Sequence, residues 1–236
     1  METPPTLAVQ LLRGAVRFAS LPFTWPAAAL RRGRGLLGAR GESAERAKFD
    51  TRKWTRALLK HLDWRRFEET CAAYFEAQGF SARVTLSAAG GPADIALCAG
   101  GSDTPSVLLH CKAWDAYRVG IKALQALRAA MAAAGIAEGL LATPGRFTQE
   151  AEAFAAKENI KLLDGATLLA RFAELGPEQA LALLKFATQG DFLTPTCPHC
   201  SIKMTSRKST GEGRAFWGCV NYPSCKQTFS TAALAP

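Results

Sequence analysis

Two polar side chains follow a short apolar run near the middle of the chain. Residues 107–115 read VLLHCKAWD, so that His110 and Lys112 come directly after apolar, strand-forming residues. Side chains two residues apart point to the same face of a β-strand, and these two are therefore expected side by side. Such a lysine can orient an attacking water and stabilise a negatively charged transition state, and a histidine can serve as a general base or bind a metal ion. This face is a candidate catalytic surface.

Two acidic residues earlier in the chain are candidates to join this face. A helix is predicted between Asp63 and Gly79, because apolar residues recur at helical spacing between a good N-cap residue and a glycine. Glu68 falls on the apolar face of this helix, where a carboxylate is costly unless it is paired, protonated or bound to metal; the alternative is that it reaches solvent at the rim. Asp94 opens a predicted strand, and pairing with the next strand could bring it beside Lys112.

Four cysteines near the C-terminus have the spacing of a metal site. CPHC is followed by eighteen residues, a third cysteine, five more residues and a fourth cysteine. Four thiolates in two close pairs bind Zn²⁺ in tetrahedral geometry and leave no open position, so this zinc is expected to be structural. The predicted ligands are Cys197, Cys200, Cys219 and Cys225. His199 is surplus to them and is expected at the surface, and the remaining cysteines are expected as small buried hydrophobic side chains.

The predicted elements around these residues form an α/β domain. The helix that carries Glu68 is followed by three strand candidates, of which the last two are joined by the turn-rich segment AGGSDTP into a hairpin. Helices and strands then alternate, and this order indicates a mixed sheet flanked by helices. The segments are, in order, SARVTLS, ADIALCA, SVLLHCKAW, a helix over 117–134, the strand GLLAT, the helix TQEAEAFAAKEN, the strand IKLLD and a helix over 166–175.

Composition and charge divide the chain into three parts. Residues 1–59 form a basic segment and linker, residues 60–186 the α/β domain, and residues 187–236 the four-cysteine module. Residues 1–66 hold 14 Lys and Arg against 5 Asp and Glu, residues 67–186 hold 10 against 13, and residues 187–236 hold 5 against 2. Basic flanks around a mildly acidic middle suit a protein that holds nucleic acid while its acidic part binds divalent cations; alternatively, the flanks only keep the protein soluble.

The N-terminal stretch LAVQLLRGAVRFASLPFTWPAAAL is the only candidate membrane segment in the sequence. Two arginines and two prolines interrupt it, so it is not predicted to span a membrane, and no basic region precedes it as in a secretory signal. A short amphipathic helix that touches a membrane is the alternative. The seven cysteines, an odd number, argue for a reducing compartment, and we expect a cytoplasmic protein without a membrane partner.

The middle of the chain resembles the Mrr-type restriction endonucleases of the PD-(D/E)xK nuclease superfamily. The resemblance rests on FEETCAAYFEAQGF, GPADIAL, VLLHCKAW and LLATPGRFTQEAEAFAAKENIKLLDGATL, and it covers roughly residues 60–175. It implies a restriction-endonuclease-like fold that hydrolyses DNA phosphodiester bonds at a Mg²⁺ (or Mn²⁺) site. The residues at the family's catalytic positions are Glu68, Asp94, His110 and Lys112, of which Glu68 and Asp94 would bind the metal. A double-strand cutter with one site per chain would act as a homodimer.

One position departs from the family's pattern, because His110 stands where Glu or Gln is usual. An imidazole nitrogen suits Mn²⁺ or Zn²⁺ better than Mg²⁺. His110 is then a general base, a ligand of a softer metal, a sign of weakened metal binding, or a half-buried histidine with ordinary hydrogen bonds. Three functions stay open: a metal-dependent DNA endonuclease of restriction or DNA-processing type, a DNA-binding protein that keeps the nuclease fold without the reaction, and an adaptor tethered by residues 1–30.

The C-terminal segment FWGCVNYPSCKQTF resembles the zinc ribbons at the C-termini of type IA DNA topoisomerases. The resemblance covers roughly residues 195–230 and implies a module that binds DNA, often single-stranded. Aromatic side chains beside basic ones suit stacking on bases, and the candidate DNA contacts are Arg214, Trp217, Tyr222 and Lys226. The alternative is that the aromatic side chains fill the small core of the ribbon itself.

Overall fold

The structure of the chain, a computed structural model, describes residues 49–85, 94–113, 118–209 and 213–230. Most of the predicted basic segment over residues 1–59, including its amphipathic stretch, lies outside the described residues. Among the helices that are described, none has the length and the apolar character needed to cross a membrane.

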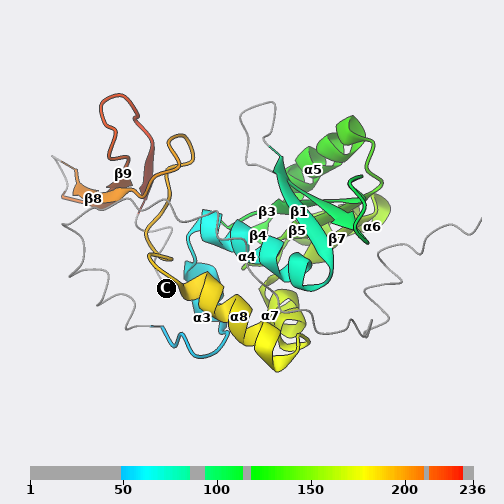
Figure 1. Cartoon of the computed structure of the whole chain (residues 1–236). Coiled ribbons are helices and arrows are strands. Elements are labelled where there is room, and N and C mark those ends of the chain that lie inside the picture. Colours follow the sequence, from blue (N-terminus) through cyan, green and yellow to red (C-terminus); the bar gives the residue numbers. More distant parts are fainter. Residues whose placement is uncertain (1–48, 86–93, 114–117, 210–212, 231–236) are drawn as a thin grey trace, which may run out of the picture. The chain divides into compact units, whose positions relative to one another are not determined.

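A five-stranded mixed sheet forms the centre of the fold (Figure 1). Its strands span Phe80–Thr85 (β1), Asp94–Ala99 (β2), Val107–Cys111 (β3), Glu138–Ala142 (β5) and Ile160–Leu163 (β7). The strand order is β1-β2-β3-β5-β7, in which β1, β2 and β3 form an antiparallel meander and β3, β5 and β7 run parallel. The predicted α/β fold with a mixed sheet flanked by helices is therefore confirmed.

Helices connect the parallel strands and flank the sheet. The helices span Arg56–His61 (α3), Trp64–Ala77 (α4), Ile121–Ala134 (α5), Gln149–Lys157 (α6), Gly165–Ala173 (α7) and Pro177–Thr188 (α8). α5 leads from β3 to β5 and α6 leads from β5 to β7, as parallel strands require a crossover. α5 buries Leu124, Leu127 and Met131 in one cluster with Leu108 of β3 and Leu141 of β5. This cluster fixes the face of the sheet on which Leu108 lies.

α4 carries one of the candidate catalytic residues and packs against β1, β3 and α8. Its buried face includes Phe67, Cys71 and Phe75, at the helical spacing that the sequence predicts. Arg66 of α4 makes two contacts with Phe186 of α8. Its guanidinium donates to the Phe186 carbonyl oxygen at 3.0 Å and lies 5.3 Å from the centroid of the Phe186 ring. α4 is therefore held on both its sheet side and its outer side.

Several element boundaries differ from the sequence prediction. α5 begins at Ile121 instead of residue 117, because Arg118–Val119 forms a short strand (β4) that pairs in parallel with Arg146–Phe147 (β6). α3 and α8 were not predicted, although each starts on a recognised signal: the Thr55 hydroxyl caps α3 by accepting the Leu58 N–H at 3.1 Å, and α8 starts with a proline. The predicted boundary after residue 186 falls in the last turn of α8.

The C-terminal module is a small antiparallel sheet next to the cysteines. Its strands span Thr205–Lys208 (β8), Ala215–Gly218 (β9) and Thr228–Ser230 (β10), in the order β10-β9-β8. The buried residues of its hydrophobic cluster are three cysteines and Met204, against which Cys200, Ile202, Trp217 and Phe229 pack. So few apolar side chains form a very small core, and a segment of this size ordinarily needs extra stabilisation, such as disulfides or a bound metal, to fold.

Candidate functional site

Glu68 lies in the second turn of α4 as a half-buried side chain. Burial is the largest cause that raises the pKa of Glu68 to about 8. The positive charges of Arg65 and Lys112 lower this pKa, and the negative charges of Asp63 and Glu69 raise it further. In the absence of a bound cation this carboxyl group is therefore largely protonated near neutral pH. A divalent cation beside it would favour the ionised form, which is the property expected of a metal-binding carboxylate.

Lys112 comes directly after β3 and brings its charge close to Glu68. The Lys112 N–H donates to the carbonyl oxygen of Ala142 at 2.8 Å, which continues the β3–β5 pairing one residue beyond the strand. Its side chain is half-buried, and its positive charge lowers the pKa of Glu68. The structure thus brings the helix carboxylate and the strand lysine, which are 44 residues apart in sequence, into one electrostatic neighbourhood.

His110 is buried within β3, with 5% of its surface exposed. It is in register with Leu141 of β5, and Leu108, two residues earlier, belongs to the cluster that α5 covers. Side chains at alternate positions share a face, so His110 is on the same side of the sheet as Leu108. One of the alternatives left open for His110 was a half-buried histidine with ordinary hydrogen bonds, and the side chain is more deeply buried than that alternative supposed.

Asp94 is the first residue of β2, and the structure describes its backbone only. β2 and β3 pair with Ile95 opposite Leu109. Continuing this antiparallel register by one residue sets Asp94 level with His110, two residues short of Lys112. In this register Asp94 and Lys112 would be diagonal neighbours on one face of the two strands. That pairing brings them together stays a prediction, because the observed pairing ends at Ile95 and Leu109.

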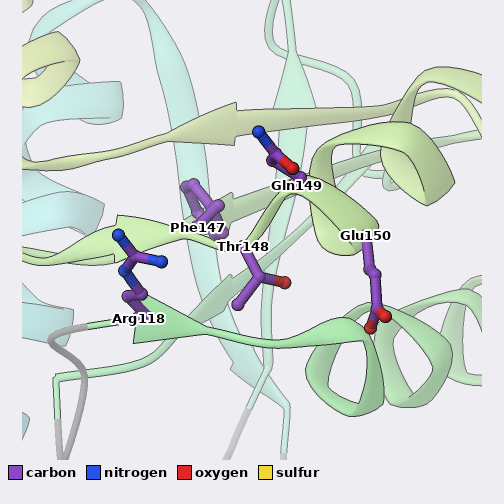
Figure 2. Close-up of a pocket in the computed structure, with 5 residues that line it drawn as sticks. All are labelled: Arg118, Phe147, Thr148, Gln149 and Glu150. Carbon is purple, nitrogen blue, oxygen red and sulfur yellow. The ribbon is translucent and has the colours of Figure 1, made fainter.

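An open pocket with a volume of about 560 Å³ lies at the start of α6, and none of the four predicted catalytic residues lines it. Figure 2 shows its lining side chains on β4, on β6 and on the first residues of α6. They are Arg118, Phe147, Thr148, Gln149 and Glu150. No function is predicted for these residues from their types and spacing. The sequence offers one relevant feature, a threonine at the start of a predicted helix. In the structure this Thr148 caps α6 by accepting the Ala151 N–H at 3.2 Å.

The structure gathers the four predicted zinc ligands into one cluster. The sulfur atoms of Cys197, Cys200, Cys219 and Cys225 all lie within 4.8 Å of one another. The sulfur atoms of Cys197 and Cys225 are 3.8 Å apart. Zinc–sulfur bonds of about 2.3 Å in a tetrahedron set sulfur atoms about 3.8 Å apart, so the donor type and the spacing both fit Zn²⁺. The predicted clustering is confirmed, and His199 is exposed beside it as expected.

The predicted DNA contacts of the module differ in exposure. Arg214 and Lys226 are exposed, and Tyr222 is 60% exposed. Trp217, in contrast, is half-buried against the cysteine cluster, so the alternative of a core aromatic applies to it. The structure adds Arg207, whose guanidinium lies 5.5 Å from the centroid of the Tyr222 ring and donates to the Cys219 carbonyl oxygen at 3.2 Å.

The mixed sheet flanked by helices is like that of restriction endonuclease folds. Residues 59–172 match the family model Mrr_cat, which describes restriction endonucleases. No curated protein sequence matches the chain.

Two solved structures are similar in arrangement, each at 18% sequence identity. The first, the MspJI restriction endonuclease in complex with a 27-mer oligonucleotide, matches over 73% of this chain and 42% of its own, with a TM-score of 0.36. The second, the DNA modification-dependent restriction endonuclease AspBHI, matches over 79% of this chain and 49% of its own, with a TM-score of 0.40. This chain thus spans less than half the length of either protein.

Proposed function

We propose that this chain is a metal-dependent DNA endonuclease with a C-terminal zinc module that binds DNA. One observation carries the proposal: the half-buried carboxyl of Glu68 has its pKa raised to about 8, chiefly by burial, and the positive charge of Lys112 acts on it. A carboxyl group whose pKa is perturbed by burial and by a nearby lysine charge is typical of catalytic sites. The pair lies inside the part of the chain that matches the restriction endonuclease family model.

Each of the four candidate residues has a chemical role in this proposal. Glu68 and Asp94 hold a Mg²⁺ or Mn²⁺ ion, for which carboxylate oxygens are suitable ligands. The ion, when bound, neutralises charge on the scissile phosphate and lowers the pKa of a bound water. Lys112 orients the attacking water and stabilises the negative charge that develops on the phosphate. His110 serves as the general base or as a further ligand, which its nitrogen makes more suitable for Mn²⁺.

The four-cysteine cluster is proposed to hold Zn²⁺ as a structural ion. Four sulfur donors leave no position for substrate, so this ion takes no part in the hydrolysis. Tyr222 with Arg207 on its ring offers an exposed aromatic and cationic surface for single-stranded DNA, beside Arg214 and Lys226. We also propose that two chains cut opposite strands of duplex DNA as a homodimer in the cytoplasm.

A cleavage assay on duplex DNA with Mg²⁺ and with Mn²⁺ tests the catalytic proposal. We expect the wild-type protein to cleave and Asp94→Ala and Lys112→Ala to bind DNA without cleaving it. The control is Lys157→Ala, which removes an exposed lysine from the last turn of α6. Cleavage by both Asp94→Ala and Lys112→Ala would show that the proposed site does not carry the reaction.

The burial of His110 favours a second candidate function, a DNA-binding protein that keeps the nuclease fold without the reaction. His110 occupies the position where the resembled family has Glu or Gln. This candidate predicts DNA binding without cleavage in Mg²⁺, Mn²⁺ or Zn²⁺. It further predicts that His110→Glu, which supplies an oxygen ligand, gains cleavage.

A further inference from the structure

The carboxylate of Asp63 accepts hydrogen bonds from the C-terminal module, although Asp63 occupies the N-cap position of α4. The sequence predicts a side chain that caps its own helix. Instead, one carboxylate oxygen accepts the Thr196 N–H at 2.9 Å, and the other accepts the Thr196 hydroxyl at 2.5 Å and the Lys203 ammonium at 3.0 Å. Asp63 is 3% exposed. A buried carboxylate is costly unless donors surround it, and every donor here comes from residues 196–203.

The backbone and side chains around Asp63 add further bonds to the same segment. The Trp64 indole N–H donates to the Thr196 carbonyl oxygen at 2.6 Å, and the Asp63 N–H donates to the Phe192 carbonyl oxygen at 2.8 Å. Lys203 also donates to the carbonyl oxygen of Thr194 at 2.7 Å. The first residues of α4 are thereby joined to residues 192–203 by a connected hydrogen-bond network, which we call the Asp63 network.

The Asp63 network is attached to the base of the first cysteine pair. Thr196 directly precedes Cys197, and it forms an isolated antiparallel bridge with Lys203. Within this bridge the Cys197 N–H donates to the Ile202 carbonyl oxygen at 2.8 Å, which closes the loop that carries both cysteines of the pair. Thr196 and Lys203, which bind Asp63, are therefore the two residues whose pairing closes the metal loop.

The other end of the network leads to the candidate catalytic carboxylate. Glu68 follows Asp63 by five residues on the same helix, which is about 7.5 Å along the helix axis. A helix moves as a rigid rod over so short a distance, so the position of its first turn sets where Glu68 lies relative to Lys112 on the sheet. The negative charge of Asp63 also contributes to the raised pKa of Glu68, which is a second physical link between them.

We infer that Asp63 is a positioning residue through which the folded four-cysteine module holds Glu68 in place at the nuclease site. This inference rests on the proposed function and adds that zinc loading of the module controls the divalent-cation site to which Glu68 of α4 contributes. Ordering of the metal loop orders Thr196 and Lys203, these hold Asp63, and Asp63 holds the start of α4. A module that only bound DNA would need no buried bonds to this helix.

The test uses the full-length, zinc-loaded protein and measures Mn²⁺ binding as well as DNA cleavage. Thr196→Val removes the hydroxyl donor and keeps the backbone N–H, whereas Asp63→Asn keeps the side-chain shape and removes its charge. We expect both variants to bind Mn²⁺ about tenfold more weakly than wild type, and to lower kcat with little change in KM for DNA. The matched control is Thr205→Val, an exposed threonine of the same module on β8, which should equal wild type.

Amide hydrogen exchange in the first two turns of α4 provides a readout that does not depend on activity. Chelation of zinc from the wild type, and Thr196→Val with zinc bound, should both speed exchange there and leave β5 unchanged. Unchanged exchange together with unchanged Mn²⁺ affinity in Thr196→Val would overturn the inference, and this variant decides if Asp63→Asn does not fold. If the wild type fails to cleave DNA, the proposed function fails, while the exchange result still decides whether the module and α4 are coupled.

Discussion

Replacement of Glu68 by glutamine should make the domain more stable at alkaline pH. The pKa of Glu68 is raised from its ordinary value of 4.5 to about 8, with burial as the largest cause. Between these two values the folded protein keeps a proton on Glu68 that the unfolded chain has already lost. The free energy of unfolding therefore falls as pH rises through this window, and it does so because ionising a buried carboxylate is costly. Glutamine has a similar shape and carries no proton that can be lost.

The size of the effect follows from the width of the window. Each pH unit within it lowers the free energy of unfolding by at most about 1.4 kcal/mol, so the full window corresponds to no more than about 5 kcal/mol. Glu68 is only half-buried and can turn toward water when it ionises, so we expect about 2 kcal/mol of this. Glu68→Gln should thus match the wild type near pH 4.5 and exceed it by about 2 kcal/mol above pH 8.

Urea unfolding of both proteins across this pH range, with zinc present and without Mg²⁺ or Mn²⁺, measures the difference directly. Other titrating groups contribute equally to the two proteins and cancel. Glu69→Gln, which removes an exposed carboxylate one residue further along α4, is the control for the loss of a negative charge from this helix. A stability difference between Glu68→Gln and wild type that stays constant with pH, or that favours the wild type at alkaline pH, would refute the assignment of a buried carboxyl with a raised pKa.

Three further predictions concern other parts of the molecule. Lys112→Ala removes a positive charge that lowers the pKa of Glu68. At alkaline pH, the difference in free energy of unfolding between proteins with Gln and with Glu at position 68 should therefore be larger when both also carry Lys112→Ala, and urea unfolding measures it. Tyr222→Ala should weaken single-stranded DNA binding by about 1–3 kcal/mol in a fluorescence titration, and it should leave the melting temperature unchanged because the side chain is exposed. Trp217→Ala removes a side chain packed on the cysteines and should lower the melting temperature. Equal melting temperatures of the two variants would contradict this packing. Gly165→Ala should destabilise the domain by at least about 1–3 kcal/mol, because the added methyl group would collide with the backbone carbonyl of Pro144; unchanged stability would show that this close approach is wrong.

Local sequence signals were sufficient for the elements that depend on local chemistry. The apolar spacing in α4 identified the helix and singled out Glu68, and the run of apolar, strand-forming residues in VLLHC identified β3. The four cysteines were recognised from their spacing alone, because a pair of ligands close in sequence already fixes half of a tetrahedral site. α3 and α8 were missed although both begin with standard signals, since a capping threonine and a proline at the first turn are common outside helices too.

The sequence by itself determined which residue types are present to do chemistry: a helix glutamate, a strand histidine and lysine, and four thiolates with zinc spacing. The tertiary structure alone decided three matters. It set the register that pairs Ile95 of β2 with Leu109 of β3, it buried His110, and it bound the Asp63 carboxylate to Thr196 and Lys203 instead of to its own helix. The physical reason is that each depends on groups far apart in the chain, which meet only when the sheet, α4 and the four-cysteine module have packed together.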